Sequence, residues 1–445
     1  RFAPTTLRVT VFANSTLVKA LHTFVFTGDA QQDFIRSMGV SMPLTGKNIK
    51  STFGAQDETS QEINLSNSNS SASLDSIGPD RFYNNIPYTA DKTVNYQLTS
   101  DAKVLFTGKE APGWIQVNSD SAAMTLAARD FWQQAPQQLQ VNGNGVVTYY
   151  QWPEAGRKVL DLRRRYKGID NVHHYDLSEW PYDGLGVAKS HEFWLDFGTK
   201  STFDGKQLSA FIDTPLYAMP DPLAVQQSNV FGPFAVRDPK RFPRLEAWQD
   251  FAINRIRANQ KAFHWDGMLD YGDTLFWGYE TSAHGIDAAP HSWLSRGYTG
   301  WLNSDGGLPH SLFLQALRSG NRDTMQLADI MARHSMDVDV CHYCPPNPAA
   351  VGGGHRHDQQ HWGNDVRGYG TATHGVIDYY LLFGDDRAKD VAIETANWHL
   401  NPSGGKVGEG AEDEDQIGGL LRMWEITGDK KFYDGAMKFL DRELD

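Results

Sequence analysis

The hydrophobic pattern of this 445-residue chain changes its period near residue 245, and that change limits what the chain can fold into. Before it, short alternating runs such as LRVTVFA, GVVTYYQW and HEFWLDFG recur between Gly, Asn, Asp and Pro clusters, which is typical of antiparallel strands in a sandwich or barrel. After it, Leu245, Trp248, Ala252 and Ile256 recur at spacings of three and four, which predicts one face of a helix. We therefore expect a β domain over residues 1–235, a Pro-rich linker over residues 213–243 and a helical domain over residues 244–445.

The helical half contains an internal repeat. In each of three segments a helix ends at a glycine, an Asn or Asp caps the next helix, and an alanine stands eight residues after the glycine. The three pairs are Gly320 with Ala328, Gly384 with Ala392, and Gly428 with Ala436. This pattern indicates helix hairpins stacked in series, in an open solenoid or an α/α toroid. Roughly 200 residues follow the linker, too few for a ring of six hairpins, so a toroid would be incomplete.

Two histidines occupy equivalent positions in this repeat. His310 lies ten residues before Gly320, and His374 lies ten residues before Gly384. We expect both side chains at the same end of the helical domain, where they favour a shared cleft. The alternative is that each is a buried, hydrogen-bonded structural histidine.

Composition and charge exclude several classes of partner. The net charge of −13 argues against nucleic acid, which needs a basic footprint, and no apolar run approaches the length of a membrane helix. An anionic substrate would need a local positive patch, for which residues 156–168 are a candidate, although such runs are often solvated. The chain starts without a Met or a signal peptide and reads as processed or truncated.

Sequons and cysteines bear on the compartment. Sequons at Asn14, Asn64 and Asn69 stand in or beside turn-rich segments and predict an extracellular, secreted glycoprotein. Cys341 and Cys344, in CHYC, are a candidate disulfide or free thiols, because a zinc ribbon would need a second pair of cysteines.

Three groups of residues compete for the chemistry. The first, in residues 351–375, mixes histidines with glycines that let the backbone approach a ligand. The second, in residues 284–310, mixes aromatic and polar groups suited to a sugar cleft. The third is on a strand, where Lys189 and His191 continue the face of Phe193 and so lie either where the sheet meets the helices or in a functional pocket. The first two groups comprise His355, His357, His361, Trp362, Arg367, Tyr369 and His374, and His284, His291, Arg296, Tyr298, Trp301, Asn303 and His310.

The histidines of the first group do not match the spacing of a known metal site. His355, His357 and His361 lack the H-E-x-x-H spacing of a helical zinc site. Calcium held by residues 411–415 or 337–340 is no better supported. We therefore expect that no cofactor is required.

Several longer motifs are distributed in order along the chain. They are RDFWQQAPQQL followed by WPE, GVAKSHEFWL, WLNSDGGLPHSLFLQALRSGN, ARHSMDVDVCHY, and GGGHRHDQQHWG followed by THGVIDYYLLFGD, with LVKALHTFVFTGDAQQDFIRSMGVSMPL near the start. Together these motifs resemble the secreted exo-rhamnogalacturonan lyases and their YetA-like bacterial relatives. The resemblance implies an N-terminal barrel, a central β-sandwich and a C-terminal α/α toroid that act on pectin. This chain is shorter, so its first residues would be the end of the barrel domain.

The resemblance implies β-elimination on an acidic polysaccharide. In that reaction a base removes the C5 proton of a uronic acid, cations neutralise its carboxylate, and an acid protonates the O4 leaving group. His361 or Tyr369 is the candidate base, Arg367 and Lys189 the carboxylate clamp, and His191 or His310 the acid.

Two other functions remain open. A glycoside hydrolase would need two carboxylic acids across the cleft, and Asp287, Asp305, Asp365 and Glu192 are available. A carbohydrate-binding or structural protein without turnover is also compatible with the thirteen tryptophans.

Overall fold

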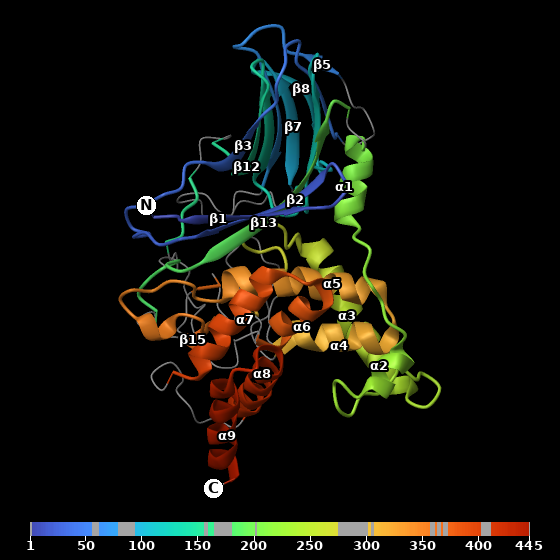
Figure 1. The fold of residues 1–445 in the computed structure, drawn as a ribbon, viewed down its shortest axis with the longest axis vertical. Helices are drawn as coiled ribbons and strands as arrows, with labels where there is room; N and C mark the ends of the chain where they lie inside the picture. Colours follow the sequence, from blue (N-terminus) through green and yellow to red (C-terminus); the bar gives the residue numbers. More distant parts are fainter. Residues whose placement is uncertain are drawn as a thin grey trace.

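The computed structural model places sheets above helices, as Figure 1 shows. It describes residues 2–55, 62–78, 94–154, 159–163, 180–200, 203–274, 301–303, 307–356, 361–362, 366–367, 373–401 and 411–444. The expected order of antiparallel β structure followed by helices is confirmed within these residues.

Two antiparallel sheets form the β part. The first has the strand order β1-β2-β13-β10-β9-β4-β5, and the second has the order β3-β12-β11-β6-β7-β8. The first sheet comprises β1 (Thr5–Val11), β2 (Leu17–Val25), β13 (Ala188–Gly198), β10 (Ala123–Ala128), β9 (Trp114–Asn118), β4 (Lys50–Phe53) and β5 (Ile63–Asn64). The second comprises β3 (Met38–Pro43), β12 (Val146–Trp152), β11 (Gln137–Asn142), β6 (Ser71–Ile77), β7 (Asn95–Ser100) and β8 (Lys103–Gly108).

The two sheets share an apolar core. Leu139 and Val141 on β11 alternate with partly exposed residues, as the period of two requires. They pack with Ile115 and Leu126 of the first sheet in one buried cluster, which makes this part a sandwich.

The helical part begins earlier than the sequence predicts. Its elements are α1 (Gly205–Asp213), α2 (Pro222–Ser228), α3 (Pro243–Phe263), α4 (Leu308–Ser319), α5 (Arg322–His334), the π-helical turn η4 (Ser335–Asp339), the 3-10 turn η5 (Pro348–Ala350), α6 (Thr373–Phe383), α7 (Asp386–His399), α8 (Ala411–Thr427) and α9 (Lys430–Leu444). The short strands β14 (Gly354–His355) and β15 (Val366–Arg367) pair with each other. Helix α1 falls inside the region expected to be β because Asp204 and Gln207 form a capping box and Leu208 and Ile212 bury one face.

The predicted hairpin repeat is confirmed. Gly320, Gly384 and Gly428 all have positive φ angles, between 66° and 70°, and each follows the end of a helix. The three alanines of the repeat are at most 1% exposed and lie in one core shared by the helices. Asn321 and Asp385 cap the helices that follow, as the sequence predicts.

The buried face predicted for α3 is partly wrong. Ile256 is buried, but Leu245 and Trp248 are 53% and 63% exposed. The helix instead buries Glu246, whose carboxylate accepts hydrogen bonds from Arg318 of α4. The first turns of α3 therefore face the neighbouring helix with a charged residue, while Leu245 and Trp248 face outward.

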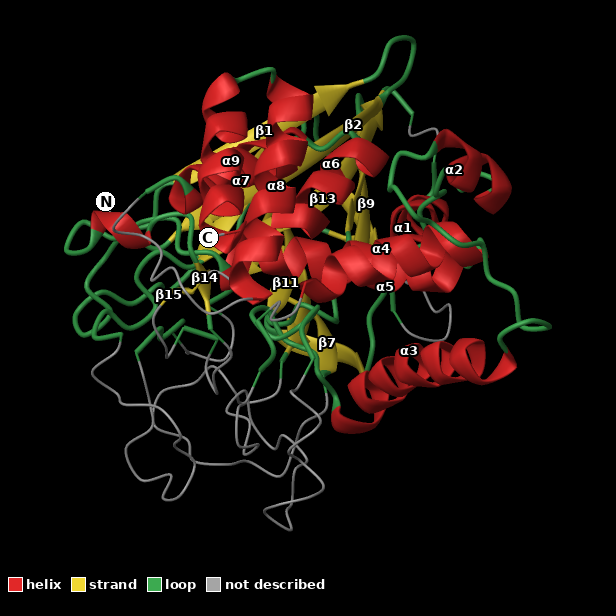
Figure 2. Ribbon diagram, turned by 90° about the horizontal axis from the view of Figure 1, so that it is seen from below, coloured by secondary structure: helices red, strands yellow, loops and turns green. Residues whose placement is uncertain are grey.

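Strand β13 is where the sandwich meets the helices. Its Phe193 enters the sandwich core. On the opposite face Ser190 bonds to Asp337 of the helical part, and Glu192 pairs with Arg129, which in turn pairs with Asp329 of α5. Figure 1 shows β13 and β1 at this boundary, and Figure 2, seen from below, shows the helices lying across the strands. The junction therefore brings residues from both parts together.

Candidate functional site

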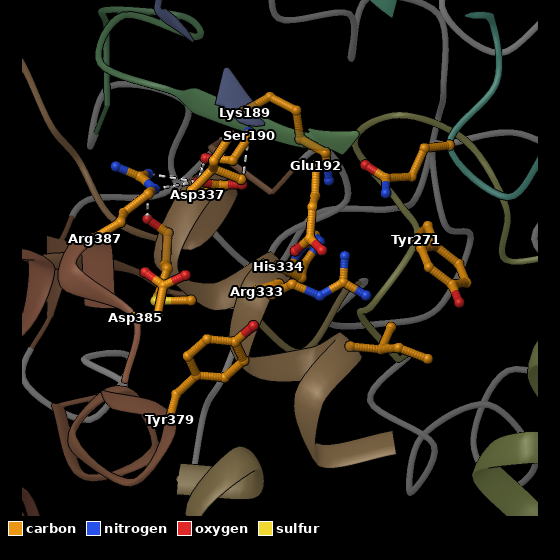
Figure 3. A pocket seen from close by; sticks show the side chains of 14 residues that line it. Lys189, Ser190, Glu192, Tyr271, Arg333, His334, Asp337, Tyr379, Asp385 and Arg387 are labelled. Carbon is orange, nitrogen blue, oxygen red and sulfur yellow. Dashed lines mark hydrogen bonds and ion pairs between the residues drawn. The ribbon is translucent and has the colours of Figure 1, made fainter. Parts of the chain in front are cut away.

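A small cavity lies at the junction between β13 and the helices. Strand β13 supplies Lys189, Ser190 and Glu192 to its lining, α5 supplies Arg333 and His334, and α6 and α7 supply Tyr379 and Arg387, as Figure 3 shows. The cavity volume is about 30 Å³, which is room for about two water-sized groups. In this structure it accommodates a carboxylate-sized group but not a whole sugar ring.

Asp337 joins the two parts of the molecule at this cavity. It is at the centre of η4, and its carboxylate accepts hydrogen bonds from the backbone N–H of Ser190 at 2.8 Å and from the Ser190 hydroxyl at 2.9 Å. On the other side the Arg387 Nε donates to it at 3.1 Å. Burial opposes ionisation, but Arg387 and Lys189 hold the pKa of Asp337 below its usual value. Asp337 therefore stays charged and fixes the strand to the helices.

Lys189 is the cation without a fixed partner in this cavity. Its side chain is buried, and within the part of the chain that the structure describes it makes neither a hydrogen bond nor an ion pair. Burial lowers the pKa of Lys189 to about 8, against the attraction of Asp337. Lys189 thus lies where the sheet meets the helices, which is one of the two positions that the sequence left open for it.

The neighbouring arginines are fully paired. Arg129 bridges Glu192 of β13 and Asp329 of α5, and Arg333 donates to Asp130 at 2.7 Å and to Asp329 at 3.1 Å. Burial opposes ionisation of Glu192 and Asp329, but the arginines lower the pKa of each to about 2. These carboxylates are therefore not general acids.

His191 does not line the cavity. It is 1% exposed beside Lys189 and opposite His22 of β2. Burial, with the neighbouring Lys189 and His22, lowers the pKa of His191 well below its ordinary value. The neutral ring is a poor proton donor, so the acid role expected for His191 does not fit this arrangement.

His361 lies in a separate buried cluster. Its Nε2 is 3.2 Å from Asp270, and its Nδ1 is 3.0 Å from the amide oxygen of Asn303 and 3.3 Å from Asp273. Burial disfavours the charged ring, but the bonds with Asp270 and Asp273 outweigh it and raise the pKa of His361 to about 9. Because the ring is fully buried and both of its nitrogens face oxygen atoms, this arrangement does not favour the base role expected for His361.

The tryptophans of this region are core residues in the structure. Trp301 stacks on the His361 ring with centroids 5.0 Å apart, and Trp362 also contacts that ring. Neither is exposed, and His355 is buried against Trp180. The sugar-binding role expected for these three residues therefore finds no accessible face in this structure.

His310 and His374 meet as the repeat predicts. Their rings lie 5.0 Å apart, and the Nδ1 of His310 is 2.5 Å from Asp378 of α6. Arg422 of α8 donates to Asp378 and approaches His374. The two histidines thus share one partly exposed site with an acid and a cation, distinct from the His361 cluster.

Several predicted site residues lie outside the described residues. They are His284, His291, Arg296, Tyr298, His357 and Tyr369, together with the side chain of Arg367 and the alternative acids Asp287, Asp305 and Asp365.

The cysteines and sequons have clear positions. Cys341 and Cys344 are both buried free thiols, so the candidate disulfide is not formed in this structure. A hydrogen bond from Cys341 lowers the pKa of Cys344 to about 7. Asn14, Asn64 and Asn69 are all exposed.

No helix among the described residues is long and apolar enough to cross a membrane.

Sequence reasoning missed Arg333, Tyr379 and Arg387 as site residues and weighed Asp337 only as a calcium ligand. Arg387 did carry a signal, because it stands in the first turn of α7, where the helix dipole disfavours a cation. Asp270 and Asp273 carried another, since they are acids close to the buried Trp265, Met268 and Leu269. Tyr379 lies among apolar residues that read as ordinary core.

Comparisons with known proteins place the chain in a family. The sequence profile of the PcRGLX-like protein C-terminal alpha/alpha toroid domain matches residues 215–401, and that of the PcRGLX-like protein central beta sandwich domain matches residues 1–49. The chain is also 26% identical over 300 residues to the uncharacterized protein YetA of Bacillus subtilis (strain 168), a match that covers 64% of this chain. The match spans a third of the length of YetA. With a sandwich, a helical hairpin array and both domain profiles, the chain belongs to the PcRGLX-like, rhamnogalacturonan lyase-like family.

Proposed function

We propose that this protein is a polysaccharide lyase that cleaves a uronic-acid-containing glycan such as rhamnogalacturonan by β-elimination. The observation that carries the proposal is Lys189, a buried ammonium without a partner among the described residues, facing a cavity of carboxylate size. A buried charge without a counter-ion is costly, and a uronate carboxylate would supply one. Membership of the rhamnogalacturonan lyase-like family supports the same substrate class.

The chemistry follows from the groups around Lys189. Neutralising the carboxylate makes the C5 proton more acidic and stabilises the enolate-like intermediate. Burial and the charge of Asp329 raise the pKa of Tyr379 well above its usual value, so its hydroxyl keeps its proton and can donate to a developing negative charge. Because His361 is fully buried and both of its ring nitrogens already face oxygen atoms, we assign the base to Tyr369, which lies outside the described residues.

The experiment uses the purified chain and three polymers: rhamnogalacturonan, polygalacturonate and a neutral galactan. We expect an increase in the ultraviolet absorption of the unsaturated uronate product with an acidic polymer and none with galactan. Lys189→Met should abolish this signal. The matched control is Lys103→Met, because Lys103 is an exposed lysine of β8 in the other sheet.

Other outcomes identify the rival functions. Reducing ends released without ultraviolet absorption would show a glycoside hydrolase, although the cavity carboxylates Glu192 and Asp337 are held ionised, which disfavours that reaction. Glycan binding that persists in Lys189→Met, with no turnover in the parent chain, would show a binding protein.

We also propose that the protein acts outside the cell. The support is that all three sequons are exposed, at Asn14, Asn64 and Asn69. Protein collected from the culture medium of its source should lose mass on treatment with an N-glycan-cleaving enzyme, and unglycosylated protein found inside the cell would contradict the proposal.

A further inference from the structure

Four buried side chains converge behind the wall of the Lys189 cavity. They are Asp273, His334, Asp339 and His361, each at most 3% exposed. One ligand atom from each lies within 4.8 Å of the other three. His334 also lines the cavity, so this group, which we call the His–Asp cluster, adjoins the candidate site.

The His334 ring is the member of the cluster whose hydrogen bonding most clearly suggests a bound ligand. With the residues that the structure describes, neither of its ring nitrogens makes a hydrogen bond, although Nε2 lies 3.0 Å from an oxygen of Asp339 and 3.7 Å from an oxygen of Asp273. The atoms are close, but their directions do not suit a proton between them. A buried imidazole with no hydrogen bond is costly unless another partner satisfies it.

The spacing of the atoms fits ligands around one ion. Two ligands of a tetrahedral ion with bonds of about 2.0–2.2 Å lie about 3.3–3.6 Å apart. The distances from Nε2 of His334, 3.0 Å to Asp339 and 3.7 Å to Asp273, lie on either side of that range. The distance between Nδ1 of His361 and Asp273, 3.3 Å, lies within it. The widest pair would draw in by about 1 Å on binding.

The surroundings orient the ligands. Asp270 lies 3.2 Å from Nε2 of His361, which turns Nδ1 toward the cluster, the arrangement in which a carboxylate holds a metal-binding histidine. Oδ1 of Asp273 accepts from the backbone N–H of Thr274 at 2.7 Å, so Oδ2 is the atom presented to the cluster. The side-chain amide of Asn303 donates to the carbonyl of His361, which has a φ of 65°.

We propose that Asp273, His334, Asp339 and His361 bind one divalent transition-metal ion, for which Zn²⁺ is the best fit. Two imidazoles with two carboxylates favour such an ion over Ca²⁺ or Mg²⁺, which prefer oxygen ligands alone. This ligand set shares only His361 with the three histidines weighed from the sequence. The ion ties the segment before residue 275 and the end of α5 to η4 and to His361, and so supports the cavity from behind.

The test measures metal rather than activity. The full chain, expressed with Zn²⁺, Mn²⁺ and Fe²⁺ in the medium and passed over a chelating column, should retain about one equivalent of metal by mass spectrometry. Removal with pyridine-2,6-dicarboxylate should lower the Tm by several degrees, and Zn²⁺ should restore it. Co²⁺ in place of Zn²⁺ should give the visible absorption of a four-coordinate site.

Variants locate the site. His334→Gln should reduce bound metal at least tenfold, and the matched control is His342→Gln, since His342 is another largely buried histidine with a carboxylate partner, Glu394 at 2.7 Å. A chain that is free of metal and whose Tm is unchanged by Zn²⁺ would overturn the proposal, as would equal metal in the two variants. If His334→Gln does not fold, the Co²⁺ spectrum and Tm of the parent chain decide. None of these measurements depends on lyase activity.

Discussion

The arginines and the lysine at the sandwich–helix junction are held in opposite ways. Arg129 and Arg333 are enclosed by carboxylates from both parts of the molecule, whereas Lys189, a few residues along β13 from Glu192, has no fixed counter-ion among the described residues. Both arrangements bury positive charge. The paired arginines therefore hold the two parts together, whereas the charge of Lys189 destabilises the fold by an amount that ligand binding can offset.

The largest expected effect is the loss of a paired arginine. Arg129→Met leaves Asp329 and Glu192 buried without one of their counter-ions, so the free energy of unfolding should fall by about 3–5 kcal/mol. Urea denaturation monitored by tryptophan fluorescence measures this change. A loss below about 1 kcal/mol would mean that the arginine does not hold the junction.

Replacing Lys189 should raise the free energy of unfolding rather than lower it. The pKa of Lys189 falls from its ordinary 10.5 to about 8 on burial, so at pH 7 the folded state holds a charge that it disfavours by about 3 kcal/mol. Lys189→Met should therefore raise the free energy of unfolding by up to that amount while it abolishes activity. Urea denaturation at pH 7 measures the gain.

The pH dependence provides a check on Lys189. A folded pKa below the unfolded one means that the parent gains stability as pH rises from about 8 to 10.5, so the advantage of Lys189→Met should shrink over that window. Asp337, Arg333, Asp130 and Asp270 surround the ammonium and are retained in the variant. A variant less stable than the parent at pH 7 would show that Lys189 is paired.

Asp213 is a partly buried acid at the edge of the arginine network, and its substitution tests the effect of its raised pKa. Burial and the neighbouring Asp130 raise the pKa of Asp213 from 3.8 to about 7, so the stability that its neutral form provides is present below pH 3.8 and is lost as pH rises toward 7. Asp213→Asn should then stabilise the protein at pH 8 by on the order of 2 kcal/mol, less than the full shift because the side chain is partly exposed.

The matched comparison for Asp213 is the same substitution at low pH. At pH 3.5 the asparagine and the protonated acid are nearly equivalent, so thermal unfolding should show little difference there. Equal stabilisation at both pH values would assign the effect to packing rather than to charge.

The smallest effect belongs to an exposed pair that crosses the same junction. Arg8 of β1 lies 2.7 Å from Asp390 of α7, but the side chain of Asp390 is 62% exposed. Asp390→Ala should cost about 0.5 kcal/mol or less, and less in 1 M salt. A loss comparable to that of Arg129→Met would mean that burial does not separate the two kinds of ion pair.

The sequence predicted the parts of the fold that repeat. Alternation located strands such as β11, and the glycine-to-alanine spacing located the helix ends and core positions of the hairpins, because these signals are local and recur. Helix α1 was missed because its capping box is a single short signal in a loop-like stretch. The face of α3 was mispredicted in part because its first turns bury Glu246 against Arg318, a long-range ion pair that apolar spacing does not reveal.

The candidate site was predicted only in part, for a reason of distance along the chain. His310 and His374 could be paired from the repeat, and Lys189 stood out as a charge on an apolar face. The partners of His361, however, lie 58 and 91 residues away, and periodicity carries no information about contacts of that kind. Buried acids beside apolar residues, such as Asp270, were the one local sign.

The π-helical turn η4 has a consequence for how this family can vary. Within its five residues, the Asp337 side chain bonds to β13 and α7, and the Asp339 side chain lies in the His–Asp cluster. An insertion or deletion in the turn would displace both acids at once, whereas a point substitution removes one. We therefore expect relatives that retain both acids to keep the same number of residues in this segment. Where a relative ends the helix without the π-helical turn, we expect it to lack both Asp337 and Asp339.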